Sequence, residues 1–141
     1  MSTKHKNGFV LLFRSDEWYQ ELSADEIRTV IDQTNAWIEQ LTAAGKVKGG
    51  MVLAREGAVI SGNNRRIVSD GPFVEAKEAI GGTLLLDVAT LQEAIAIARN
   101  SPGLAYNSSI EVRPVGDECP LTTRAREHAI DRDCATARSP I

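Results

Sequence analysis

The 141-residue sequence predicts an α+β fold, in which two helices alternate with short strands. Residues 9–13 and 83–88 are apolar runs without alternation, a pattern typical of strands that are buried on both faces. Residues 23–44 place apolar side chains at helical spacing behind a capping box. The elements follow in the order β-α-β-(hairpin)-β-α-β. This order indicates a ferredoxin-like split βαβ sandwich with an antiparallel sheet.

Two helices can cover one face of such a sheet but not both, so we place both helices on one face. The strands at 9–13 and 83–88 are apolar on both sides, so the second face needs a cover. We expect a second copy of the chain there, which gives a sheet-to-sheet homodimer, a dimeric α/β barrel. The C-terminal tail could instead cover that face.

The first helix is expected over residues 23–44. Ser23 and Glu26 have the spacing of a capping box, in which each side chain bonds the other residue's backbone amide. Gly45 supplies the left-handed residue that often ends a helix. The expected buried stripe consists of Ile27, Val30, Ile31, Ile38 and Leu41, with Thr34 on the same side.

A second strand is expected over residues 47–53. Residues 58–61 and 65–68 look like the arms of a hairpin, because residues 62–64 (Gly-Asn-Asn) tolerate positive φ.

A second capping box at Thr90 and Glu93 starts a short helix, which Pro102 limits. Residues 109–113 alternate between apolar and polar, as expected for a strand with one wet face. Pro114 restricts that strand to an edge or to a strand end.

We predict one domain over residues 1–116 and a C-terminal tail, weakly helical or mobile, over 117–141. The net charge is −3 and no basic stripe occurs, which argues against nucleic-acid binding. No apolar run approaches the roughly 18 residues that span a bilayer, and residues 1–6 lack a signal-peptide pattern. We therefore expect a cytoplasmic protein that does not bind membranes.

The cysteines and histidines are too few and too scattered to predict a metal site, and no cofactor is expected. Cys119 and Cys134 are expected as free thiols, although a disulfide between them is possible in an oxidising compartment. His5 and His128 are the only histidines, and a transition-metal site needs converging N or S ligands.

The segment 67–78 carries the strongest candidates for a functional site. Asp70 precedes Gly71 and Pro72, which stiffen the turn and hold the carboxylate in place. Asp70 could serve as a general base or a polar anchor in a pocket. The alternative is a turn aspartate that accepts its own backbone amides.

Glu75 and Glu78 share a face if this segment forms a helical turn, so two carboxylates could divide acid and base roles. Lys77 could bind an anionic group of a ligand. The alternative for all three is a solvated, charged turn. We also assign ligand binding to Arg14 and Trp18, although Trp18 could instead pack in the core or at the dimer interface.

The segment 68–78, with the sequence VSDGPFVEAKE, is followed by Ile80 and two glycines and then by an apolar strand. It resembles the DGPF motif of the YCII-related proteins. Residues 109–114 are similar to the last strand of that family, and the resemblance covers roughly residues 8–115. It implies a ferredoxin-like fold that dimerises through its sheets, with a pocket between sheet and motif.

The resemblance implies no established reaction, but related enzymes of similar fold act on small ring compounds. Catalytic YCII-type members pair an Asp with a His near the end of the first strand. Residues 14–17 (RSDE) contain no His, so this chain departs from that pattern.

Two functions are therefore predicted. The first is binding of a small organic ligand, with cofactor-free acid/base chemistry by Asp70 and help from Glu75, Glu78 or Lys77. The alternative is a non-catalytic protein-interaction or regulatory module. The resemblance links that module to an extracytoplasmic-function sigma-factor pathway.

Overall fold

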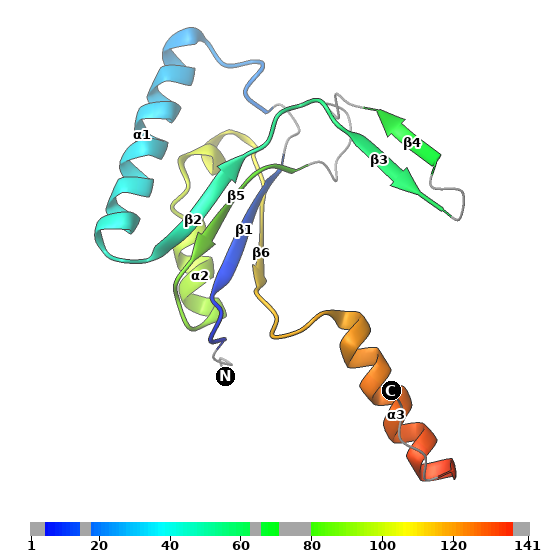
Figure 1. The fold of residues 1–141 in the computed structure, drawn as a ribbon. Helices are drawn as coiled ribbons and strands as arrows, with labels where there is room; N and C mark the ends of the chain where they lie inside the picture. The colour runs from blue at the N-terminus through cyan, green and yellow to red at the C-terminus, as the bar shows by residue number, and fades with distance from the viewer. Residues whose placement is uncertain (1–4, 15–17, 63–65, 71–79, 137–141) are drawn as a thin grey trace.

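A computed structural model describes residues 5–14, 18–62, 66–70 and 80–136, with only the backbone path for 66–70 and 131–136. It shows an α+β fold built on an open, antiparallel four-stranded sheet in the order β2-β5-β1-β6 (Figure 1). These strands are β1 (Phe9–Arg14), β2 (Val47–Val52), β5 (Ile80–Leu86) and β6 (Ile110–Pro114). The arrangement is consistent with the predicted ferredoxin-like sandwich.

The helix α1 (Ala24–Ala43) begins and ends where the sequence predicts. The Ser23 hydroxyl accepts from the Glu26 amide at 3.1 Å, and the Glu26 carboxylate accepts from the Ser23 amide at 2.9 Å. Gly45 has a φ of 74°, and the Lys46 amide donates to the Leu41 carbonyl. This six-to-one bond is typical of a Schellman ending.

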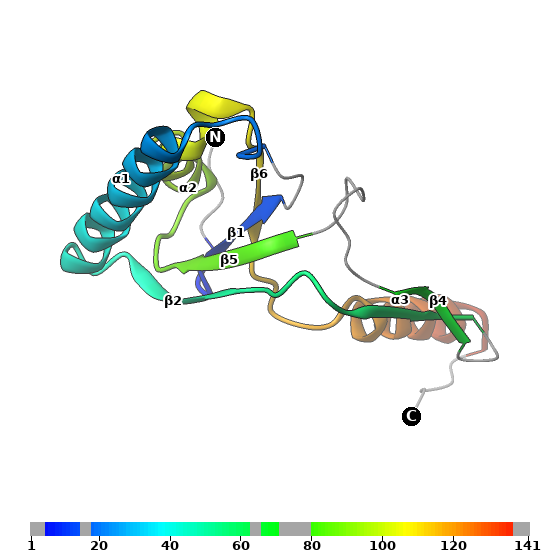
Figure 2. The same cartoon turned by 90° about the horizontal axis from the view of Figure 1, so that it is seen from above.

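The helices α1 and α2 (Leu91–Ala98) cover one face of the sheet (Figures 1 and 2), as predicted. Phe9, Leu11 and Leu86 point into this layer and are fully buried. They form the core with Trp37 of α1 and Ile97 of α2. Burying each large apolar side chain contributes roughly 1.5–3 kcal/mol, so this face provides most of the hydrophobic stabilisation.

The other face of the sheet carries the alternate residues of the same strands. Val10 and Leu12 of β1 and Leu85 of β5 are only partly buried, and Met51 of β2 is 62% exposed. Val10 pairs with Leu85 across the two central strands. Among the described residues, no helix packs against this side, which we call the open face.

A two-stranded hairpin lies between β2 and β5 in the sequence and extends away from the sheet (Figure 1). Its strands are β3 (Ala58–Ser61) and β4 (Arg66–Asp70). The predicted arms are therefore correct, although β4 runs two residues further, to Asp70. Gly62 adopts the positive φ expected of the turn. Val59 and Ile60 are 46% and 66% exposed.

The C-terminal tail contains a longer helix than its weak apolar pattern indicates, α3 (Pro120–Thr136). Arg126 donates to the Glu118 carboxylate just before this helix, and Thr123 donates to the same group. Arg126 and Thr123 lower the pKa of Glu118 to about 2. The contact is therefore present above the usual carboxyl pKa and is lost only as the pH falls toward 2.

Three further observations bear on the predictions. A short 3-10 helix, η1 (Pro102–Tyr106), follows α2 and was not predicted. Cys119 is a free, exposed thiol. No helix in the described ranges combines the length and the apolar character needed to cross a membrane.

Candidate functional site

Three strands meet at the end of the sheet where β1 stops. The register of β1 against β5 shifts after Phe13, so that Arg14 pairs with Ile80, the first residue of β5. The Arg14 amide donates to the carbonyl of Ser109, directly before β6. The polypeptide therefore re-enters the sheet after residue 79 beside Arg14.

The predicted acid/base residues lie mostly outside the described part of the chain. Asp70 is the last residue of β4, where its backbone pairs with Ala58 at the start of β3. The side chain of Asp70 lies outside the description, as do Glu75, Lys77 and Glu78 altogether. The hairpin register thus places the backbone of Asp70 at the end of the hairpin where β3 begins and β4 stops.

Arg14 lies on the open face and forms an ion pair there. Its Nη2 donates to Oε1 of Glu111 at 3.1 Å, and its side chain is 27% exposed. The second oxygen of Glu111 lies 3.7 Å from Nε of Arg113. These charges line the β6 side of the open face, next to Leu12, which pairs with Glu111.

Trp18 lies on the opposite side of the sheet, in the helical layer. Its indole stacks on Tyr106 of η1, with ring centroids 6.3 Å apart and an interplanar angle of 18°. The ring also packs over Gly103, where an added Cβ would come within 3.1 Å of it. Tyr19 meets Trp18 edge to face. The indole is therefore held from several directions.

A pocket of about 350 Å³ opens between Trp18 and the first half of α1. Its walls are largely apolar, and its polar side chains come from Tyr19, Thr34 and Asn35. The lining residues are Trp18, Tyr19, Leu22, Ile27, Val30, Ile31, Thr34 and Asn35. Such a surface suits an apolar or aromatic molecule that carries one or two polar groups.

Sequence reasoning identified Trp18 but missed most of this pocket. Ile27 and Ile31 were expected in the buried stripe of α1, yet Ile31 is 53% exposed and lines the pocket. Helical periodicity cannot reveal which part of an apolar stripe remains uncovered. The structure also separates Trp18 from Arg14, since their side chains lie on opposite sides of the sheet.

The described residues contain no group of three or more His, Cys, Asp or Glu side chains that could hold a metal ion.

The fold and the pocket define an α+β protein of ferredoxin-like type with a ligand-sized cavity in its helical layer. The model of the YCII-related domain matches residues 9–118, so the chain belongs to the YCII-related family.

Two individual proteins are similar to this chain. An uncharacterized protein of Rhizobium meliloti (strain 1021) is 48% identical over 50 residues, which are 35% of this chain and 40% of that protein. The chain thus matches less than half the length of this relative.

The second is the solved structure of 5-chloro-2-hydroxyhydroquinone dehydrochlorinase (TftG) from Burkholderia phenoliruptrix AC1100, in complex with 2,5-dihydroxybenzoquinone. It is 16% identical, covers 78% of this chain and 95% of its own, and superposes with a TM-score of 0.42.

Proposed function

We propose that this YCII-family protein binds a small organic ligand with an apolar, ring-sized body in the pocket beside Trp18. The pocket itself carries the proposal. Its volume of about 350 Å³ falls within the roughly 300–1,000 Å³ of small-molecule sites. Its apolar walls with few polar groups also match the composition of such sites.

The immobilised indole of Trp18 supports this proposal. Tyr106 stacks on one face of the ring, and Gly103 allows the backbone of η1 to approach closely. A wall fixed before binding loses little conformational freedom when a ligand arrives, which favours affinity. Val30, which is buried, completes the pocket from α1.

The proposed chemistry is cofactor-free proton transfer by Asp70, Glu75 and Glu78, with Lys77 holding an anionic group. The chain path supports this part of the proposal. After Asp70 the chain returns to the sheet at Ile80, beside Arg14. Arg14 is the last residue of β1, and Trp18 of the pocket lies four residues further along the chain. The proposed catalytic segment therefore leads to the end of the sheet near which the pocket lies.

We further propose that the protein is a homodimer joined through the open face. Val10, Leu12 and Leu85 give this face an apolar centre, and Arg14, Glu111 and Arg113 give it a charged margin. The hairpin β3–β4 points to the same conclusion. A two-stranded hairpin is at best marginally stable in water unless it packs on something.

A protein-interaction or regulatory module is the second candidate function. The exposed apolar residues Val59 and Ile60 on the hairpin and Leu121 on α3 favour it. Large exposed apolar side chains such as these are candidate contact points for another protein. A link to an extracytoplasmic-function sigma factor is one form of this proposal.

A thermal-shift screen with phenol, catechol, benzoate and indole tests the ligand-binding proposal. A ligand that binds the folded state raises the melting temperature, and the stabilisation grows with the logarithm of the ratio of its concentration to its Kd. Ile31→Gln places a polar group in the pocket wall and is expected to remove the stabilisation. Ile130→Gln on α3 is the matched control, since Ile130 is 59% exposed and outside the pocket lining.

Stabilisation that persists unchanged in Ile31→Gln and in Trp18→Phe would place the ligand outside this pocket. The same screen with Asp70→Asn tests the acid/base part. A ligand whose effect survives Asp70→Asn unchanged does not depend on that carboxylate for binding.

A further inference from the structure

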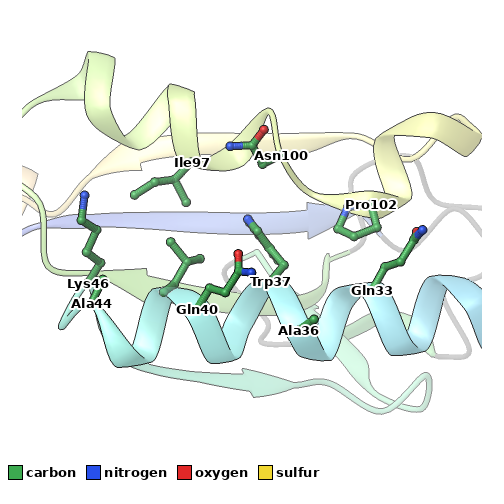
Figure 3. Close-up of a pocket in the computed structure, with 10 residues that line it drawn as sticks. Gln33, Ala36, Trp37, Gln40, Ala44, Lys46, Ile97, Asn100 and Pro102 are labelled. Atoms are coloured by element: carbon green, nitrogen blue, oxygen red, sulfur yellow. The ribbon is translucent and has the colours of Figure 1, made fainter.

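A second cavity, of about 470 Å³, lies on the other side of α1, in the groove between α1 and the α2–η1 segment. Figure 3 shows side chains from both sides of this groove, among them Trp37 and Gln40 of α1 and Asn100 and Pro102 opposite. The two cavities have no lining residue in common. The groove is therefore distinct from the pocket beside Trp18.

Trp37 contributes a buried hydrogen-bond donor to this groove. The residue is 8% exposed, and its Nε1 is fully covered and has no acceptor among the described residues. Figure 3 shows this nitrogen on the side of the ring that faces α2 and Asn100. Phe13 meets the indole edge to face, with centroids 6.4 Å apart, and helps to fix the ring. A buried donor left unpaired costs about 1–3 kcal/mol, so the site favours an added acceptor.

The rest of the lining supplies one positive charge and further donors. Among the described lining residues, Lys46 alone carries a charge, and it projects from one end of the groove (Figure 3). Its Nζ lies 3.0 Å from Oε2 of Glu93, and both side chains are 40% exposed. Gln33, Gln40 and Asn100 add side-chain amides, while Leu41, Ile97 and Pro102 provide apolar surface.

We propose that this groove binds small monocarboxylates with a short apolar chain. The carboxylate accepts the Trp37 N–H and is attracted by Lys46, a cation at one end of the groove whose charge Glu93 partly offsets. The apolar chain lies along Ile97 and Pro102. Charge-assisted hydrogen bonds of this kind are stronger than neutral ones. Because Nε1 is covered, a neighbouring side chain must turn aside. Gln40 is exposed and can do so by a rotamer change, after which its amide can also donate to the carboxylate.

Binding of hexanoate, followed through the two indole N–H resonances of ¹⁵N-labelled protein, tests the proposal. The sequence contains two tryptophans, so Trp18 provides an internal reference. The Trp37 resonance is expected to shift saturably with hexanoate, and the Trp18 resonance to stay in place. Hexylamine, with the same chain and the opposite charge, is expected to leave the Trp37 resonance unchanged.

Matched variants locate the interaction. Trp37→Phe removes the donor and Lys46→Met removes the charge. Each is expected to weaken hexanoate binding, measured by calorimetry, roughly tenfold, the loss typical of one hydrogen bond to a charged group. Lys48→Met is the control, because Lys48 lies two residues further on, in β2, and pairs with Asp87 away from the groove. If Trp37→Phe fails to fold, Lys46→Met and Lys48→Met still decide the outcome.

Two results would overturn the proposal. One is an affinity for hexanoate that Lys46→Met and Lys48→Met reduce equally. The other is a Trp37 indole resonance that does not shift with hexanoate but does shift in Gln40→Ala. That result would show that the Gln40 side-chain carbonyl is the acceptor for the Trp37 N–H.

Discussion

The two faces of the four-stranded sheet are made by the same strands, yet within the described part of the chain helices cover only one of them. On the helical side, Phe9, Leu11 and Leu86 have no exposed surface. On the open side, their neighbours Val10, Leu12 and Leu85 are equally apolar but remain partly exposed. Successive side chains of a strand point to opposite faces, so one apolar run contributes both to the buried core and to a partly exposed apolar surface.

The folding of a single chain therefore explains the apolar residues on the helical side of β1 and β5, but not those on the open face. A strand with one wet face usually alternates apolar and polar residues, as β6 does. The runs in β1 and β5 do not alternate, which indicates that a second layer covers the open face. A homodimer through the open face would supply that layer.

Leu85→Glu is expected to have the largest effect, on assembly rather than on folding. It would place an unpaired carboxylate at the centre of the proposed interface, and an uncompensated buried charge costs about 3–5 kcal/mol. Light scattering should show the mass of one chain for the variant and of two for the wild type. Leu121→Glu on the 78% exposed Leu121 is the control. A wild-type protein that is monomeric at micromolar concentration contradicts the dimer.

Leu11→Ala and Leu12→Ala compare the two faces directly. Leu11 is fully buried against the helices, so its truncation is expected to lower the free energy of unfolding by about 3 kcal/mol. Leu12 lies on the partly exposed face, and in the monomeric Leu85→Glu background we expect its truncation to cost about 1 kcal/mol. Urea unfolding measures both. Equal losses would mean that the open face is packed as tightly as the core.

Gly50→Ala and Gly49→Ala test the same contrast at the edge strand β2. A Cβ at Gly50 would lie 2.7 Å from the carbonyl oxygen of Thr83, while Gly49 has nothing within 4 Å of that position. We expect Gly50→Ala to cost about 1–3 kcal/mol by overpacking. The cost of Gly49→Ala should be below about 0.5 kcal/mol. A large loss from Gly49→Ala would indicate that another chain packs against β2.

The ion pair at the margin of the open face is expected to contribute least. Arg14 and Glu111 are 27% and 38% exposed, and such pairs are worth up to about 1 kcal/mol. A double-mutant cycle with Arg14→Gln and Glu111→Gln measures the coupling, because Arg14 makes further contacts that a single change would include. A coupling well above this value would place the pair in a buried interface.

Local patterns in the sequence were sufficient for most of the fold. The capping box at Ser23 and the glycine at position 45 set the bounds of α1, because both act through backbone bonds within a few residues. The hairpin follows from Gly62 and its neighbours for the same reason. The order of elements then restricts the sheet to few topologies.

The candidate sites depend on contacts that no local pattern contains. Ile31 has the spacing of a core residue, but its exposure depends on where the loop carrying Trp18 runs. The unpaired N–H of Trp37 arises from the fit between α1 and α2, which are far apart in the sequence. The sequence also could not divide Arg14 and Trp18 between the two sides of the sheet, because strand alternation places a strand residue such as Arg14 but not a residue outside a strand such as Trp18.

The hairpin has a consequence for how the sheet assembles. The end of β2 lies beside the start of β5, since Val52 pairs with Gly82. A tight turn could join these strands, but residues 53–79 intervene. Closing a loop of this length instead of a short turn costs about 2 kcal/mol of chain entropy. The β2–β5 pairing therefore becomes a long-range contact, which should slow folding, and a variant with a short turn in place of residues 53–79 should fold faster.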